Sequence, residues 1–241
     1  MLFRTRLPEQ ESLPLQGLPL NCLVTRSRRK TLALHVRHDQ VEVRAPLHIT
    51  TAEIVVFIQK HQHWLKRKLS EKQQRAAEVL LLKDGATIFY KGRSLKLVLQ
   101  KANQPGIIIS DDQMLIQGPD VSQEGAARIL KHWLQQQAKA WLPPRTRALA
   151  EYLGAGHKLK DVVFRKTRSK WGHCTAGGRI QYNWLIMLAP DAVIDYMISH
   201  EVCHLLHMNH SPAFWQAVAS VCPDYTRYTG WLKRNEHRLW F

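Results

Sequence analysis

Residues 200–204, with the sequence His-Glu-Val-Cys-His, constrain this chain more than any other segment. Two histidines four residues apart lie on one face of an α-helix, where both imidazoles can reach a single metal ion. With 13 histidines in 241 residues, chance predicts only about 0.03 matches to such a pattern. Ile194, Met197 and Ile198 precede the segment at helical spacing. The pattern therefore predicts a buried helix that carries a metal site.

Glu201 lies between the two histidines in the sequence and is predicted to remain outside the coordination shell. A zinc ion lowers the pKa of a bound water molecule to about 7. A neighbouring carboxylate can accept the proton of that water while the oxygen attacks a carbonyl group, and can then pass the proton to the leaving amine. The segment thus predicts a zinc-dependent hydrolase, a peptidase, with Glu201 as its catalytic base.

A third ligand is expected, because a catalytic zinc ion usually has three protein ligands and one open position. His207 lies seven residues beyond His200, about 10 Å along a helix, which is too far for easy chelation. His207 therefore fits a second-shell or oxyanion role better. His210 becomes available if the helix ends near residues 208–209, because Asn209 tolerates the left-handed conformation. We therefore favour His210 as the third metal ligand.

The first half of the chain is predicted to be mostly β-structure with one helix. Residues 1–20 contain three prolines and are interpreted as an irregular arm, followed by a β-rich region over residues 21–120. Thr50 and Glu53 form a predicted capping box that opens a helix to about residue 75. The period-two patterns predict three hairpins, over residues 32–43, 87–90 with 96–100, and 106–109 with 114–117.

A domain boundary is expected near residue 120, with a zincin-like α+β domain over residues 121–241. A helix should begin after Ser122, break at Pro143-Pro144, and be followed by a second helix that ends at Gly154. The next elements are expected to be strands at 162–164, 179–184 and 185–188, with helices from about residues 190, 212 and 223. The fold class predicted for the whole chain is α+β.

Charge and composition bear on partners and location. The formal net charge of +16 can attract nucleic acid or other anionic partners, although the densest basic runs, 26–30 and 66–68, are short. No segment has the apolar length of a membrane span, and the N-terminus turns polar too early for a signal peptide. The four cysteines show no CxxC pair, so reduced thiols and a cytoplasmic protein are expected.

Several segments together resemble the YgjP-like metallopeptidases, a family related to the SprT-type proteases. The resemblance covers about residues 22–235, and the segments that carry it are Arg28–Pro46, Ser169–Cys174, Ile180–Trp184, Leu188–Pro190, His200–His204, Asn209–Trp215 and Cys222–Tyr225. It implies a zincin-type catalytic domain with His200, His204 and His210 as ligands and Glu201 as base. His173 stands where the family usually has serine, and we expect it to pack against the strand turn.

Three functions remain open at this point: a zinc peptidase acting on peptides or proteins, a nucleic-acid-associated SprT-like protease, and a non-catalytic metal-containing binding protein. An extended substrate would pair with the edge of residues 179–184 or 185–188. Tryptophans 171, 184, 215 and 231 are expected in the core. The candidate oxyanion stabilisers are His207, Tyr225, Tyr228 and His237.

Overall fold

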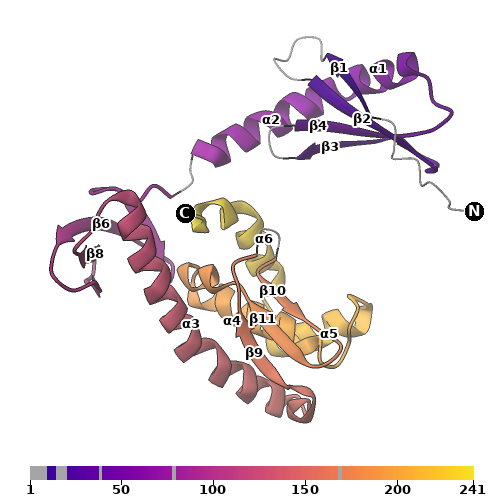
Figure 1. Cartoon of the computed structure of the whole chain (residues 1–241). Coiled ribbons are helices and arrows are strands. Elements are labelled where there is room, and N and C mark those ends of the chain that lie inside the picture. The colour runs from indigo at the N-terminus through magenta and orange to yellow at the C-terminus, as the bar shows by residue number, and fades with distance from the viewer. Residues whose placement is uncertain (1–9, 15–20, 38–39, 78–79, 168–169) are drawn as a thin grey trace, which may run out of the picture. The chain divides into compact units, whose positions relative to one another are not determined.

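The computed structural model describes residues 10–14, 21–37, 40–77, 80–167 and 170–241. The chain divides into two compact units, Met1–Ala77 and Glu78–Phe241, and each is described here by itself (Figure 1). This division differs from the boundary expected near residue 120. The reason is that strands of residues 87–118 share one hydrophobic core with the helices that come after them. The predicted α+β fold class is confirmed.

The first unit contains a four-stranded sheet of order β1-β2-β4-β3, in which β2 and β4 are parallel. The hairpin predicted over residues 32–43 is confirmed by antiparallel β3 and β4. The predicted irregular arm lies outside the described residues except for residues 10–14, which form a strand. The four strands are β1 (Gln10–Pro14), β2 (Asn21–Ser27), β3 (Ala33–Arg37) and β4 (Gln40–Pro46).

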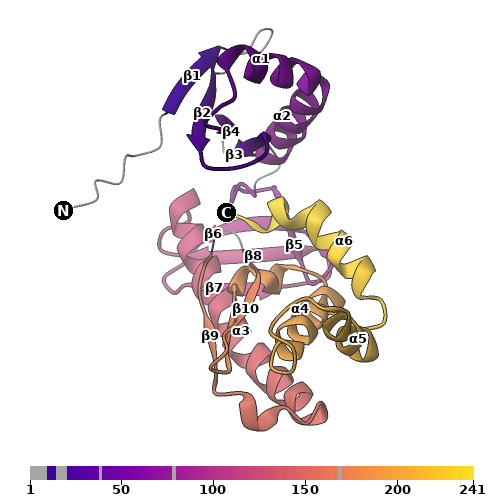
Figure 2. The ribbon, with the colours of Figure 1, turned by 90° about the vertical axis from the view of Figure 1, so that its right-hand side faces the viewer.

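Two helices, α1 (Thr51–Lys60) and α2 (Gln62–Ala77), cover one face of this sheet (Figure 2). The capping box is confirmed: the Thr50 hydroxyl accepts from the Glu53 amide, and the Glu53 carboxylate accepts from the Thr50 amide at 2.8 Å. The predicted helix to about residue 75 is therefore present, with a break at His61. The core between helices and sheet consists of Cys22, Val24, Val41, Val43, Ala45, Ile54, Ile58, Leu65 and Leu69.

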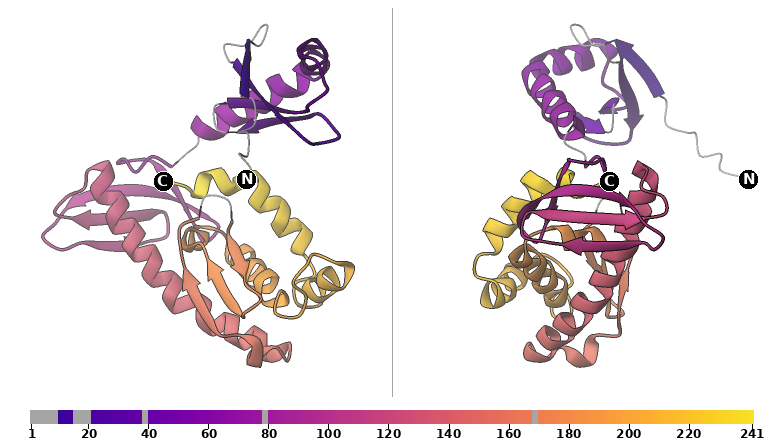
Figure 3. Two further views of the ribbon diagram at one scale, coloured as in Figure 1. Left: turned by 45° about the vertical axis from the view of Figure 1, so that its right-hand side comes forward. Right: turned by 90° about the vertical axis from the view of Figure 1, so that its left-hand side faces the viewer.

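The second unit begins with another four-stranded sheet, of order β5-β6-β8-β7. Both predicted hairpins are confirmed, and the parallel pairing of β6 with β8 joins them. Helix α3 packs on this sheet (Figure 3). The elements are β5 (Thr87–Tyr90), β6 (Arg93–Lys101), β7 (Gly106–Ile109), β8 (Gln113–Gly118) and α3 (Gln123–Tyr152).

Helix α3 runs without a break through Pro143-Pro144, so the predicted interruption was wrong. Each proline removes one backbone donor, which leaves the carbonyl groups of Lys139 and Ala140 without their helical partners. Both residues are exposed, so water can satisfy these carbonyls. One face of this stretch packs into the core: Leu142 and Thr146 are buried, and the Thr146 hydroxyl donates to the Leu142 carbonyl at 2.8 Å. Packing of this face therefore outweighs the loss of two hydrogen bonds.

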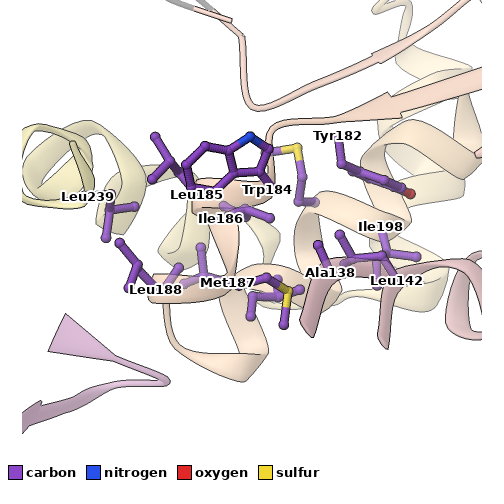
Figure 4. Close-up of a cluster of buried hydrophobic side chains, with 14 of the residues drawn as sticks. Ala138, Leu142, Tyr182, Trp184, Leu185, Ile186, Met187, Leu188, Ile198 and Leu239 are labelled. Carbon is purple, nitrogen blue, oxygen red and sulfur yellow. The ribbon is translucent and has the colours of Figure 1, made fainter. Parts of the chain in front are cut away.

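A smaller sheet of order β10-β11-β9 comes next, with β9 parallel and β10 antiparallel to β11. The strand expected at 185–188 is instead the 3₁₀-helix η2 (Trp184–Leu188), because the Asn183 side chain caps it by accepting from the Leu185 amide. All five residues of η2 are buried, and a short apolar run fits a buried turn as well as a strand (Figure 4). The three strands are β9 (Asp161–Phe164), β10 (Gly172–Cys174) and β11 (Arg179–Tyr182).

The remaining helices begin close to the predicted residues. These elements are η1 (Gly156–Lys158), α4 (Asp191–Cys203), α5 (Pro212–Val221), α6 (Tyr225–Asn235) and η3 (Glu236–Leu239). Ser211 caps α5, and Pro212 occupies its first turn, as the sequence predicted. Among the helices of the described residues, none combines the length and apolar character that a membrane span requires.

Helix α4 is held at its N-terminal half by two cations that share one aromatic ring. Lys91 Nζ and Arg145 Cζ lie 4.2 Å and 3.5 Å from the centroid of Trp141. Lys91 also pairs with Asp191 at 3.4 Å, and Arg145 with Asp195 at 3.6 Å. Because Lys91 lies in the β5–β6 turn and Arg145 in α3, these contacts fix α4 relative to both elements.

Candidate metal centre

The structure brings the three predicted metal ligands into one cluster. Helix α4 ends at Cys203, with His204 as its C-cap, about one turn before the end that the sequence suggested. The following turn returns His210 to the helix, so that ligand atoms of His200, His204 and His210 all lie within 4.8 Å of one another. The Nε2 atoms of His200 and His210 are 3.1 Å apart. Three imidazoles that converge in this way can hold one metal ion.

His204 is oriented by the main chain of the same turn. Its Nδ1 atom lies 3.0 Å from the carbonyl oxygen of His207, to which it donates, and this leaves Nε2 for a metal. His207 thus contributes through its backbone carbonyl, whereas its imidazole is not part of the cluster. The sequence spacing indicated a supporting role for His207 but not the atom involved, because that depends on where the helix ends.

Two aromatic residues of α5 pack against the three imidazoles. The fully buried Phe214 ring lies 4.4 Å from that of His204, in a stacked arrangement, and 4.8 Å from that of His210. Trp215 stacks on His210 with a centroid separation of 5.6 Å. Sequence analysis did not assign Phe214 to the site and placed Trp215 in the core. The available signal was their position in the first turn after the Ser211 cap.

Glu201 is only 3% exposed and lies beneath the β10 strand. Burial raises the pKa of its carboxyl group to about 8, and the positive charge of Lys170 and a backbone hydrogen bond from Cys174 oppose this shift. Its Oε2 atom is buried and has no hydrogen-bond partner among the described residues. A buried carboxylate oxygen without a partner is costly, so this atom is suited to a ligand that the polypeptide does not supply.

Two histidines of the cluster, His200 and His204, favour the neutral form that binds metals. Burial lowers the pKa of His200 to about 4, and the nearby charges of His204 and His210 act in the same direction. Burial also lowers the pKa of His204, against the opposing effect of the His207 carbonyl. Neutral imidazoles at pH 7 can donate a lone pair without first losing a proton. The donor set and its protonation therefore fit a divalent metal ion.

The candidate oxyanion stabilisers lie at different distances from the three clustered histidines. Tyr225 stacks on Trp215 at 5.1 Å and so reaches His210 only through that ring. The ring of Tyr196, which sequence analysis missed, lies 5.9 Å from that of His200, and Tyr228 lies 6.4 Å from Tyr196. The signal for Tyr196 was its position four residues before His200. His237 belongs to η3 and is not one of the three clustered histidines.

His173 is exposed on β10 instead of packed against the strand turn. Its charge contributes to lowering the pKa of His204, which places it within electrostatic range of the cluster. Ser169, the first residue of the neighbouring sequence segment, lies outside the described residues. Of the tryptophans expected in the core, Trp184 is buried, and Trp171, Trp215 and Trp231 are partly buried against the same core.

The edge strand next to the cluster is β10, not either segment that the sequence suggested. Strand β11 lies between β10 and β9, and residues 185–188 are helical. The Trp171 carbonyl and the Thr175 amide bond to β11. Because antiparallel pairs alternate, the main-chain groups of Gly172 and Cys174 point away from β11, toward the free edge. Helix α4 packs against this strand.

Comparison with known families gives one match of high coverage. The model of the YgjP-like metallopeptidase domain matches residues 30–235, which is most of the chain. Searches of curated proteins and of solved structures found no match. The match includes the three clustered histidines, Glu201 and the β10 edge strand. The chain therefore belongs to the YgjP-like metallopeptidase family.

Proposed function

We propose that this protein is a zinc-dependent peptidase in which His200, His204 and His210 hold the ion and Glu201 is the general base. The observation that carries the proposal is the buried carboxylate of Glu201, which follows His200 in α4 and has one oxygen without a hydrogen-bond partner among the described residues, together with three converging imidazoles. A structural metal site is closed by four protein ligands and needs no base. Three ligands and a neighbouring carboxylate are the arrangement of a catalytic site.

Zinc is the metal that best suits this donor set. Imidazole nitrogens favour zinc over the hard cations magnesium and calcium, which prefer oxygen ligands. When bound, zinc would supply Lewis acidity that lowers the pKa of a water molecule to about 7 and polarises a substrate carbonyl. The backbone carbonyl of His207 supports this role by fixing the tautomer and orientation of His204.

Glu201 can move the proton that peptide hydrolysis requires. A general base is most effective when its pKa lies near the working pH, and burial brings the pKa of Glu201 to about 8. The carboxylate accepts a proton from the attacking water and then delivers it to the leaving amine. Water is excluded from most of its surface, so the proton is not lost to solvent between these two steps.

The free edge of β10 is suited to an extended peptide. An unpaired strand edge offers backbone donors and acceptors that a substrate strand can use, independent of substrate side chains. Strand β10 packs against α4, the helix that carries Glu201, and the added methyl group of a larger residue at Gly172 would overlap the Glu201 side chain. A peptide paired there would lie next to the general base. This strand replaces the two segments that the sequence analysis favoured.

The decisive experiment compares wild-type protein with Glu201→Gln, both loaded with zinc, on a peptide library. The substitution keeps the size of the side chain and removes its basicity. We expect cleavage to fall about 100- to 10,000-fold while the zinc content stays at that of wild type. His157→Ala, at an exposed histidine of η1, serves as a matched control and should cleave like wild type. Equal cleavage by wild type and Glu201→Gln would overturn the enzymatic proposal.

Nucleic-acid binding is a second candidate, supported by the net charge of +16 and by cations on the surface of the first unit. Arg28, Lys30, Lys60 and Lys66 are exposed there. Such a surface would contact phosphates without reading sequence, so its affinity would fall steeply with added salt. Titration of labelled DNA at low and at physiological salt tests this. If no binding occurs at low salt, the candidate is eliminated, whereas the peptidase proposal is unaffected.

A further inference from the structure

Gly172, in the site's edge strand, lies against the carboxylate of Glu201. A methyl group built on Gly172 would have Oε1 of Glu201 as its nearest neighbour and would lie 2.6 Å from both Cγ and Cδ of the same side chain. Carbon atoms in contact are normally separated by about 3.5 to 4.0 Å. The space that any other residue would fill at this position is thus taken by the carboxylate end of Glu201.

The need for glycine at position 172 comes from this space and not from the backbone. Glycines 85, 92, 154 and 178 have positive φ angles, at which larger residues are strained, and Gly172 does not. A β-strand weakens with glycine, because glycine adds no side chain to pack and loses more chain entropy. A glycine in β10 therefore lowers the stability of the strand. Its structural benefit is the space that it leaves for the Glu201 side chain.

The same strand also acts on the charge of the carboxylate. The backbone amide of Cys174 lies near enough to the Glu201 carboxylate to oppose the rise of its pKa. Gly172 and Cys174 are two residues apart, so their main-chain groups point to the same edge of the strand. One position thus makes room for the carboxylate, and the other favours its charged form. Because Glu201 is 3% exposed, it cannot avoid an obstruction by turning into solvent.

From these contacts we infer that Gly172 is a positioning residue, which sets where the carboxylate of Glu201 lies beside β10. The inference rests on the proposed function of Glu201 as base for its effect on catalysis, but not for the contact itself. The three atoms nearest to an added methyl group all belong to the movable end of the Glu201 side chain. The chain can therefore fold around the obstruction by displacing the carboxylate. The expected cost falls on the placement of the base more than on the fold.

Gly156 offers a matched control. A methyl group built there would also overlap a glutamate carboxylate, that of Glu151. Glu151 is exposed, so its side chain can swing into solvent at little cost. Gly156→Ala thus repeats the chemical change and the kind of overlap at a place remote from the cluster. It isolates the effect of displacing a buried carboxylate that cannot turn into solvent.

The first measurement uses the full chain loaded with zinc. We expect Gly172→Ala to keep its zinc and to lose kcat about 100-fold, because a displacement near 1 Å of a reacting group has an effect of this size. The KM should change little, and Gly156→Ala should have both constants of wild type. A kcat of Gly172→Ala equal to that of wild type would overturn the inference. So would a loss of zinc that accounts for the whole loss of activity.

The second measurement does not depend on activity. It is a double-mutant cycle that measures the interaction between the two residues from melting temperatures. The four proteins are wild type, Gly172→Ala, Glu201→Ala and the double variant. We expect Gly172→Ala to lower the Tm in the wild-type background and not in the Glu201→Ala background, where the space is free. Equal shifts in both backgrounds would overturn the inference.

These outcomes separate the two hypotheses. If wild type cleaves no peptide, the proposed function fails, and the Tm cycle still decides whether Gly172 accommodates Glu201. If Gly172→Ala does not fold, recovery of folding in the double variant with Glu201→Ala supports the inference. Failure of the double variant to fold as well would show that Gly172 serves the strand and not the carboxylate.

Discussion

The two four-stranded sheets of this protein have the same topology but different surroundings. The order β1-β2-β4-β3 in the first unit corresponds to β5-β6-β8-β7 in the second, and each sheet has a parallel central pair with an antiparallel strand on either side. Each sheet is followed by a helix whose first turn is capped by a hydroxyl side chain, that of Thr50 or Ser122. The same module of strands and helix thus occurs once in each unit.

The two modules differ in how the chain continues after the first turns of the helix that follows each sheet. In the first unit the helical segment breaks at His61 and contributes to a small core of its own. In the second unit α3 continues for 30 residues, and its C-terminal half packs against α4, η2 and β9. There the Thr146 hydroxyl lies 3.0 Å from that of Tyr182 in β11. The shared module alone therefore does not produce a metal cluster. The second unit has one because its longer helix gives α4, η2 and β9 a surface to pack against.

The largest expected effect follows from removing the metal, which should change the stability of the second unit and not that of the first. His210→Ala removes one of three ligands and should abolish stoichiometric zinc binding and peptide cleavage. Because a metal stabilises only the part that binds it, zinc should raise the unfolding temperature of the second unit in wild type and not in the variant. Metal analysis and calorimetry measure these effects. Full zinc occupancy in His210→Ala would refute its assignment as a ligand.

A second comparison removes one equivalent core leucine from each module. Leu65 and Leu134 are both fully buried and both come directly after a His-Trp pair in their helices. Truncation of either to alanine should cost about 2–5 kcal/mol of unfolding free energy. Leu65→Ala should leave kcat and zinc affinity unchanged, since its core does not include the cluster. Chemical denaturation followed by activity assays checks this, and a fall in kcat for Leu65→Ala would show that the units depend on each other.

The third prediction concerns pH in the metal-free protein. The pKa of Glu201 is raised from 4.5 to about 8, so its contribution to stability is present below pH 4.5 and is lost as pH rises to about 8. His200, with a pKa lowered to about 4, contributes in the opposite direction, but its effect is complete above pH 6.5. Between pH 6.5 and 8 the second unit should therefore lose about 2 kcal/mol.

Glu201→Gln provides the control for that pH dependence. Glutamine does not titrate, so the stability of metal-free Glu201→Gln should be flatter between pH 6.5 and 8 than that of wild type. Urea unfolding at several pH values in the presence of a chelator gives both curves. The idea fails if the two curves are parallel, which would mean that Glu201 titrates in the folded protein as it does when unfolded.

The smallest effect is expected at the two helix caps. Thr50→Ala and Ser122→Ala each remove a side-chain acceptor from the first turn, at a cost of about 1 kcal/mol. Thr50→Ala also disturbs the reciprocal bond from Glu53, so it should be the more costly of the two. Thermal unfolding of the two variants tests this order. A larger loss for Ser122→Ala would indicate that the continuation of α3 depends on its first turn.

Features that depend on neighbouring residues could be predicted from the sequence. The hairpins result from alternating patterns around a turn, and the Thr50–Glu53 capping box from residues three apart. The parallel pairing of β2 with β4 and of β6 with β8 could not be predicted, because no local pattern specifies partners that are distant in sequence. The path of α3 through two prolines likewise depends on the burial of Leu142 and Thr146 against the rest of the unit, which helix propensity cannot predict.

The site shows the same limit. The spacing of His200 and His204 placed two imidazoles on one face, and the Ser211 cap gave a reason for His210 to turn back. The position of the α4 end could not be read from the sequence, so the contact of His204 with the His207 carbonyl was not predicted. Strand β10 has three residues and begins with glycine, which gives too weak a pattern to recognise.

The continuous helix α3 has a mechanical consequence. Thirty helical residues rise about 45 Å, so a single continuous helix joins the sheet of β5 to β8 with α4, the helix that carries two of the clustered histidines. A hinge inside α3 would have to break further backbone hydrogen bonds where two are already missing at the prolines. Any opening that admits a polypeptide to the cluster should therefore arise in the short connections among α4, α5 and α6, while the sheet and α3 remain a fixed frame.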